Sequence, residues 1–70
     1  MRASKSIPII VAENIKQKRK ALKMTQGELA ELLGYSPKAI SKWESGTGTP
    51  PTVILPELAR VLQTNVESLY

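Results

Sequence analysis

The fold is decided by the stretch from Thr25 to Gly46, which reads TQGELAELLGYSPKAISKWESG. Thr25 is followed three residues later by Glu28, which is the spacing of a capping box, where each side chain bonds to the backbone of the other residue. A helix is therefore predicted over residues 25–33. Gly34 is expected to end this helix, because the residue just past a helix C-terminus often adopts a positive φ.

A second helix is predicted over residues 36–44, after a turn of two residues. Ser36 can cap its first turn, and Pro37 suits the first helical position, where no backbone N–H is needed. Ile40 and Trp43 lie three residues apart, which places both on the face that turns toward the core. The opposite face carries polar side chains that can reach a partner rich in hydrogen-bond acceptors: Lys38, Ser41 and Lys42.

The segment before this helix pair is interpreted as its support. A first helix is expected from Ile7 or Ile9 to Leu22, with an apolar stripe at helical spacing. Residues 1–6 are expected to form a flexible basic N-terminus, and an arm that follows DNA phosphates is the alternative. Arg19 falls on the apolar stripe of the first helix, so this guanidinium requires a partner.

A fourth helix is expected over residues 52–62, and a short fifth helix is expected after Asn65, which can cap it. Pro56 conflicts with the fourth helix, because a proline in a helix interior costs about 3 kcal/mol. Either the helix starts late, with Pro56 in its first turn, or its first turn is distorted. The sequence thus predicts an all-α fold, a compact five-helix domain over residues 7–70 with a helix-turn-helix at about 25–44.

Composition narrows the chemistry that these 70 residues can perform. The chain has no Cys, His or Asp, which excludes Ser-His-Asp and Cys-His catalysis and zinc sites with imidazole or thiolate ligands. No metal, cofactor or enzymatic activity is expected. Ten Lys and Arg against six Glu give a net charge of +4, which favours an anionic partner, with nucleic acid first and an acidic membrane surface second. No apolar run approaches the roughly 20 residues of a spanning helix, and the predicted partners do not include a membrane.

The central stretch resembles the lambda-repressor-like helix-turn-helix family, which comprises phage repressors, Cro-type proteins and bacterial Xre-type regulators. The resemblance covers about residues 11–69. The matching residues are Thr25-Gln26, Leu29-Ala30, Gly34, Ile40-Ser41 and the Trp43-Glu44-x-Gly46 combination.

The resemblance implies that the helix beginning at Ser36 lies in the major groove of double-stranded DNA. Lys38 and Lys42 are then expected to face base edges, with Ser41 nearby, because lysine can donate to guanine O6 and N7. Pro37 departs from the family, in which many members place a polar base-reading side chain there. Pro37 is expected to make an apolar contact instead, for example with a thymine methyl group.

Other side chains are expected to position the protein on the DNA. Gln26 resembles the family glutamine that binds a phosphate and braces the recognition helix. Arg19 and Glu44 resemble a family ion pair that joins the first helix to the end of the recognition helix. Further phosphate contacts are expected from Thr25, Ser36 and Thr47.

Two functions remain open at this stage. The first is a sequence-specific transcriptional regulator, acting as a repressor, that binds operator DNA as a homodimer. Its cellular location would be the cytoplasm, as a bacterial or phage-encoded, nucleoid-associated protein. The alternative is a protein-interaction module, such as the antitoxin of a toxin-antitoxin pair, with the toxin as its partner. The candidate dimer patch consists of Val53, Ile54, Val66 and Tyr70.

Overall fold

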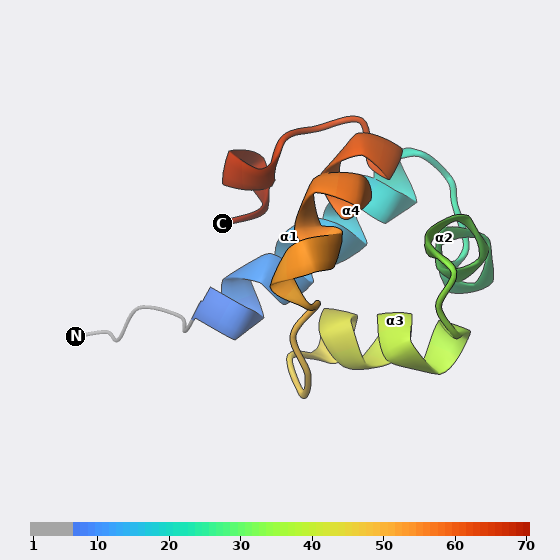
Figure 1. Cartoon of the computed structure of the whole chain (residues 1–70), viewed down its shortest axis with the longest axis horizontal. Coiled ribbons are helices and arrows are strands. Elements are labelled where there is room, and N and C mark those ends of the chain that lie inside the picture. The colour runs from blue at the N-terminus through green and yellow to red at the C-terminus, as the bar shows by residue number, and fades with distance from the viewer. Residues whose placement is uncertain (1–6) are drawn as a thin grey trace.

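The computed structural model describes residues 7–70, which form four α-helices and two short 3₁₀ turns (Figure 1). The expected flexible N-terminus, residues 1–6, lies outside the described residues. The elements are α1 (Ile7–Ala21), α2 (Gln26–Leu33), α3 (Pro37–Ser45), η1 (Thr52–Ile54), α4 (Leu55–Val61) and η2 (Val66–Leu69).

The local signals around the helix pair act as predicted. The Glu28 N–H donates to the Thr25 hydroxyl at 3.0 Å, and the Thr25 N–H donates to the Glu28 carboxylate at 2.8 Å. Ser36 caps α3 by accepting from the Ala39 N–H at 3.2 Å. Gly34 ends α2 with φ of 75°, in the left-handed region that favours glycine. These short-range bonds set the ends of both helices independently of the rest of the chain.

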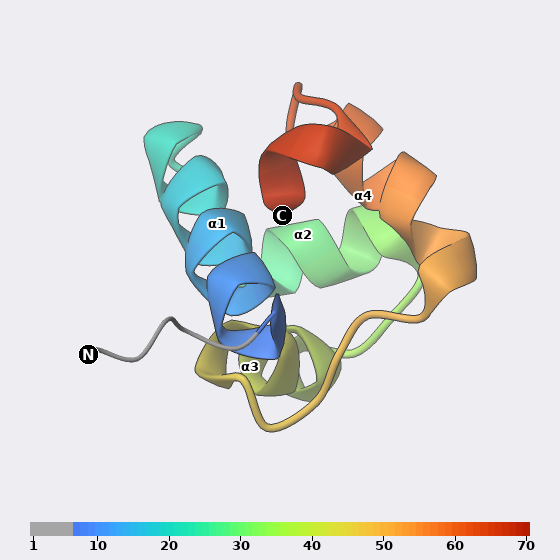
Figure 2. The ribbon, with the colours of Figure 1, turned by 90° about the vertical axis from the view of Figure 1, so that its left-hand side faces the viewer.

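The helices enclose one hydrophobic core. In Figures 1 and 2, α3 lies along one side of the molecule with α1 and α2 packed on it, and α4 packs against α2 and η2. The buried core side chains come from all four α-helices, the residue after α4 and η2: Val11, Ile15, Leu29, Ala30, Leu33, Ile40, Trp43, Leu55, Leu58, Ala59, Leu62 and Leu69.

The C-terminal part of the chain differs from the five-helix expectation. The segment expected as a fifth helix is the single 3₁₀ turn η2, capped by the Asn65 side chain, which accepts from the Ser68 N–H at 2.8 Å. This turn is held to α1, because the Asn14 side-chain amide donates to the Leu69 carbonyl at 3.0 Å. One turn suffices here, because it only has to carry the fully buried Leu69 into the core.

The structure also resolves the conflict at Pro56. Residues 52–54 form the 3₁₀ turn η1, and the α-helix starts at Leu55, so Pro56 lies in the first helical turn. A proline is tolerated there, because the first N–H groups of a helix have no intrahelical acceptor. Both alternatives offered by the sequence are therefore realised: a late start and a distorted first turn. Among the described residues, no helix has the length and apolar character needed to cross a membrane.

Candidate nucleic-acid interface

The outer face of α3 exposes the side chains that the sequence proposed for base contact. Pro37, Lys38, Ser41 and Lys42 are all exposed. Within residues 7–70, neither lysine ammonium group makes an ion pair or a hydrogen bond with another residue. Lys38 and Lys42 lie four residues apart, on the same side of α3, so both charges are available to one partner surface.

The inner face of α3 is fixed by apolar packing. Ile40 is fully buried and Trp43 is 5% exposed, so both belong to the core as predicted. The ring of Tyr35, in the turn before α3, meets the Trp43 ring edge-on with 5.1 Å between ring centroids. Tyr35 itself stays partly exposed, so its ring lies against Trp43 at the surface of the molecule. An aromatic pair in this geometry contributes about 0.5–1.5 kcal/mol of stability beyond the burial of its surface. This packing holds α3 in place, with its outer face toward solvent.

The C-terminal end of α3 is tied to the following loop through the Lys42 carbonyl. This oxygen accepts from the backbone N–H groups of Gly46, Thr47 at 3.2 Å and Gly48 at 3.3 Å. The Ser45 hydroxyl donates to the same carbonyl at 3.1 Å and lies 2.9 Å from the Thr47 hydroxyl. Thr47, a candidate phosphate contact, is exposed, and these hydrogen bonds hold it beside the end of α3.

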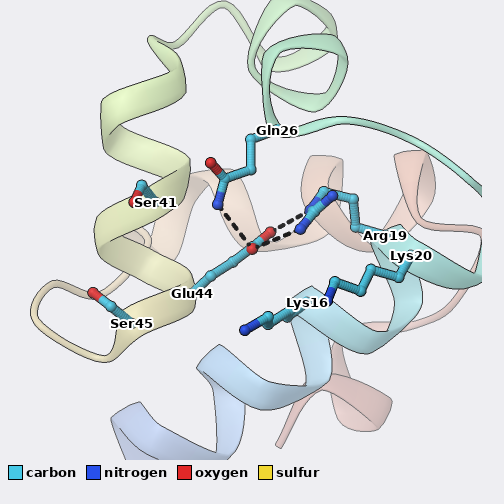
Figure 3. Close-up of a pocket in the computed structure, with 7 residues that line it drawn as sticks. All are labelled: Lys16, Arg19, Lys20, Gln26, Ser41, Glu44 and Ser45. Atoms are coloured by element: carbon cyan, nitrogen blue, oxygen red, sulfur yellow. Dashed lines mark hydrogen bonds and ion pairs between the residues drawn. The ribbon is translucent and has the colours of Figure 1, made fainter.

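Arg19 and Glu44 meet across α1 and α3, as the position of Arg19 required. Arg19 Nε donates to Glu44 Oε2 at 2.6 Å, and Arg19 Nη2 donates to Glu44 Oε1 at 3.0 Å, so the pair is bidentate (Figure 3). The two side chains are 10% and 3% exposed. Hydrogen bonding to Glu44 raises the pKa of Arg19 above its ordinary value, although burial opposes this, so the guanidinium is charged.

Gln26 and Met24 complete this network. Gln26 Nε2 donates to Glu44 Oε1 at 3.1 Å, and Arg19 Nη1 donates to the Met24 carbonyl at 2.7 Å. One ion pair thus joins α1, the link before α2, the start of α2 and the end of α3. Gln26 therefore contacts the end of α3 within the chain, whereas its phosphate contact stays a prediction, for which the amide has a second N–H to donate.

Thr25 and Ser36, the candidate phosphate contacts at the helix starts, each have a hydroxyl hydrogen that can donate to a ligand. Thr25 and Ser36 each accept a backbone N–H bond through the side-chain oxygen, which leaves the hydroxyl hydrogen free to donate. Both residues are exposed, and each begins a helix whose positive dipole end favours an anion. They lie at the starts of α2 and α3, the two helices of the helix-turn-helix.

Sequence reasoning missed a basic hollow between α1 and α3. From the sequence, Lys16 and Lys20 are expected only to add to the basic surface of the first helix, with a solvated helix face as the alternative. The signal that could have found them is their spacing: Lys16 lies three residues before Arg19 and four residues before Lys20, so it neighbours both side chains on the surface of α1. The hollow measures about 290 Å³, and its lining comes from three helices: Lys16, Arg19, Lys20, Gln26, Ser41, Glu44 and Ser45 (Figure 3).

The known proteins that are similar to this chain include transcriptional regulators and an enzyme. The chain is 32% identical over 59 residues to the cryptic phage CTXphi transcriptional repressor RstR of Vibrio cholerae serotype O1, covering 84% of this chain and 53% of the repressor. It is 40% identical over 55 residues to the HTH-type transcriptional regulator DicA of Escherichia coli strain K12, covering 79% of this chain and 41% of that regulator.

The enzyme is (S)-2-hydroxypropylphosphonic acid epoxidase of Streptomyces wedmorensis, 39% identical over 59 residues, which cover 83% of this chain and 30% of the enzyme. A solved structure of this epoxidase superimposes with a TM-score of 0.85 at 34% identity, over 94% of this chain and 35% of that chain. The chain therefore spans between about a third and about half of the length of these relatives. The similarity to a third of an enzyme does not carry the enzyme's activity to this chain.

A family profile described as helix-turn-helix, HTH_3, matches residues 15–69, which is most of the chain. These residues run from α1 through η2 and include the capped helix pair, the ion pair and the exposed face of α3. With the phage repressor and the DicA regulator among its relatives, the chain belongs to the lambda-repressor-like helix-turn-helix family.

Proposed function

We propose that this chain is a sequence-specific binding domain for double-stranded DNA, residues 7–70, that acts in a transcriptional regulator. The proposal rests on one observation above all: α3 has a buried inner face and an outer face with two unpaired lysines. An α-helix of about 10–12 Å diameter fits the major groove, which is about 12 Å wide. Lys38 and Lys42 donate to base edges in this arrangement, Ser41 lies beside them, and Pro37 contacts a thymine methyl group.

The remaining candidate residues position α3 on the duplex. Gln26, Thr25, Ser36 and Thr47 donate to backbone phosphates around the groove, and the Arg19–Glu44 pair holds α1 and α3 at a fixed angle. We infer a repressor acting on operator DNA, because RstR, a relative over most of this chain, is named a repressor. A homodimer is part of this proposal, because helix-turn-helix dimers read two half-sites about one helical turn apart. In this role the protein works in the cytoplasm, on a bacterial or phage genome.

Selection of bound duplexes from a random DNA pool tests this function, followed by titration of the selected site by fluorescence anisotropy. The Lys38→Ala variant is expected to lose about 1–3 kcal/mol of binding and to lose base preference at particular positions. Arg60→Ala, which removes the same charge from the exposed surface of α4, is the matched control and is expected to retain the preference. Lys38 is a phosphate contact instead if its removal weakens all sequences equally.

The protein-interaction alternative is favoured by exposed apolar side chains away from α3. Leu32 is 59% exposed and Val53 is 84% exposed. An antitoxin-like module predicts a stoichiometric complex with one protein and no enrichment of any duplex from the random pool. A wild-type chain that enriches a single DNA motif in the absence of other proteins contradicts this alternative as the sole function.

A further inference from the structure

The hollow between α1 and α3 carries two positive charges that nothing in residues 7–70 neutralises. Arg19 and Gln26 together engage both carboxylate oxygens of Glu44, so this anion is already satisfied. Lys16 and Lys20 form no ion pair or hydrogen bond through their ammonium groups with any residue in that range. Figure 3 shows both lysine side chains beside the space that separates α1 from α3. The hollow, called the basin below, therefore has two unpaired positive charges beside an ion pair that is already satisfied.

This basin adjoins the face of α3 that is proposed to enter DNA. Ser41 lines the hollow and immediately precedes Lys42, so the basin and the base-reading face share one edge of the helix. A helix of about 10–12 Å fills a groove of about 12 Å. The sugar-phosphate strands that border the groove must then run along the flanks of α3, and α1 with its two lysines lies on one flank.

Building on the DNA-binding function proposed above, we propose that the hollow receives one phosphate of the DNA backbone, held between the ammonium groups of Lys16 and Lys20. This assignment makes α1 a DNA-contacting helix. The volume of about 290 Å³ is ample for a phosphate group with retained water, since a single water needs only about 10–15 Å³. Gln26, at the start of α2, also lines the hollow, and the second N–H of its side-chain amide can donate to that phosphate.

Each neutralised phosphate adds about 0.9 to the slope of log affinity against log salt concentration. The double variant Lys16→Gln/Lys20→Gln is therefore expected to bind with a slope smaller by about 0.9. The ratio between the affinities of wild type and variant then falls about 3.5-fold between 50 and 200 mM salt. The loss is expected to be equal on the selected site and on random duplex, because a phosphate contact carries no base information.

Lys18→Gln/Lys23→Gln is the matched control, because it removes the same charge from the opposite side of α1 and from the link that follows it. Its slope is expected to stay close to the wild-type value. Circular dichroism checks that both variants fold. An equal slope for Lys16→Gln/Lys20→Gln and wild type overturns the phosphate assignment, whereas a wild type that binds no duplex at all overturns the DNA-binding function itself.

Neutral methylphosphonate groups, placed one at a time along each strand of the selected site, locate the contact. At one phosphate position, the methylphosphonate is expected to lower the affinity of wild type but not that of Lys16→Gln/Lys20→Gln, because the variant no longer contacts the charge of that phosphate. Inorganic phosphate titrated onto the free protein distinguishes the other source of this anion. Saturable binding of inorganic phosphate at the lysines, with no such methylphosphonate position, assigns the hollow to a free anion and overturns the proposal.

Discussion

Arg19 and Glu44 are 25 residues apart in sequence, and they form a buried hydrogen bond between two charged side chains. Each charge has lost most of its hydration, with side-chain exposures of 10% and 3%. The attraction between them offsets that loss only while both remain, so the pair acts as a condition on the packing of α1 against α3 rather than as a large surplus of stability.

The Glu44→Gln variant is expected to lower the free energy of unfolding by about 3–5 kcal/mol, because it leaves the Arg19 charge buried without a counter-charge. Urea unfolding followed by circular dichroism measures the loss. Arg60→Ala, which breaks the exposed ion pair with Glu57, is the control and is expected to change the midpoint little.

A second variant separates the pair's net contribution from the cost of breaking it. Arg19→Met/Glu44→Met replaces both charges with apolar side chains and is expected to recover most of the stability lost in Glu44→Gln. A double variant that is less stable than Glu44→Gln would show instead that the pair itself stabilises the fold.

At the scale of an element, α2 contains a glycine that helix propensity does not favour. Gly27 lies in its first turn, where glycine is a poor helix former. A Cβ added at Gly27 would meet its nearest neighbour, the Thr25 hydroxyl, at 3.9 Å, which is ordinary contact. No neighbouring backbone approaches this position, so the packing of residues 7–70 does not require a glycine there.

Gly27→Ala is accordingly expected to raise the free energy of unfolding by up to about 1 kcal/mol, because alanine loses less entropy in a helix. Thermal unfolding measures the gain. Gly34→Ala is the contrast: its φ of 75° strains a side chain even though nothing lies within 4 Å, so destabilisation is expected. Were Gly27→Ala to destabilise the protein, the helix geometry around Thr25 would have to be reconsidered.

At the scale of the molecule, the proposed dimer patch divides in two. Val53 and Ile54 lie in η1, just before α4. Val66 is the first residue of η2 and Tyr70 follows η2, so both lie beyond the other end of α4 (Figure 2). Ile54 and Val66 are half-buried against the core, which leaves Val53 as the most exposed member at 84%.

Val53→Gln is expected to weaken binding to a two-half-site operator while leaving binding to a single half-site unchanged, because only the former gains from contact between copies. Analytical ultracentrifugation with each duplex measures the stoichiometry and the affinity. Leu32→Gln, which changes an exposed apolar residue on α2, is the matched control. Equal loss on both duplexes would place Val53 at the DNA rather than between subunits.

The sequence by itself determined the helix pair and its outward face. The Thr25 and Ser36 caps, the stop at Gly34 and the inward pair Ile40 and Trp43 depend on bonds and spacings within four residues, so they can be read directly from the chain. The partner of Arg19 was accessible only through its position on an apolar stripe and the family resemblance.

Only the tertiary structure decided the rest. The last helix is a single turn, which Asn14 holds, and a 3₁₀ turn before α4 places Pro56 in the first helical turn. Packing of the helices also brings Lys16 and Lys20 of α1 to the same hollow as Ser41 of α3. The physical reason is range: backbone preferences act over one helical turn, whereas a hollow between two helices depends on how buried side chains set their separation. A charged residue's exposure is known from its own helix, but its neighbours across the core are known only once the core is packed.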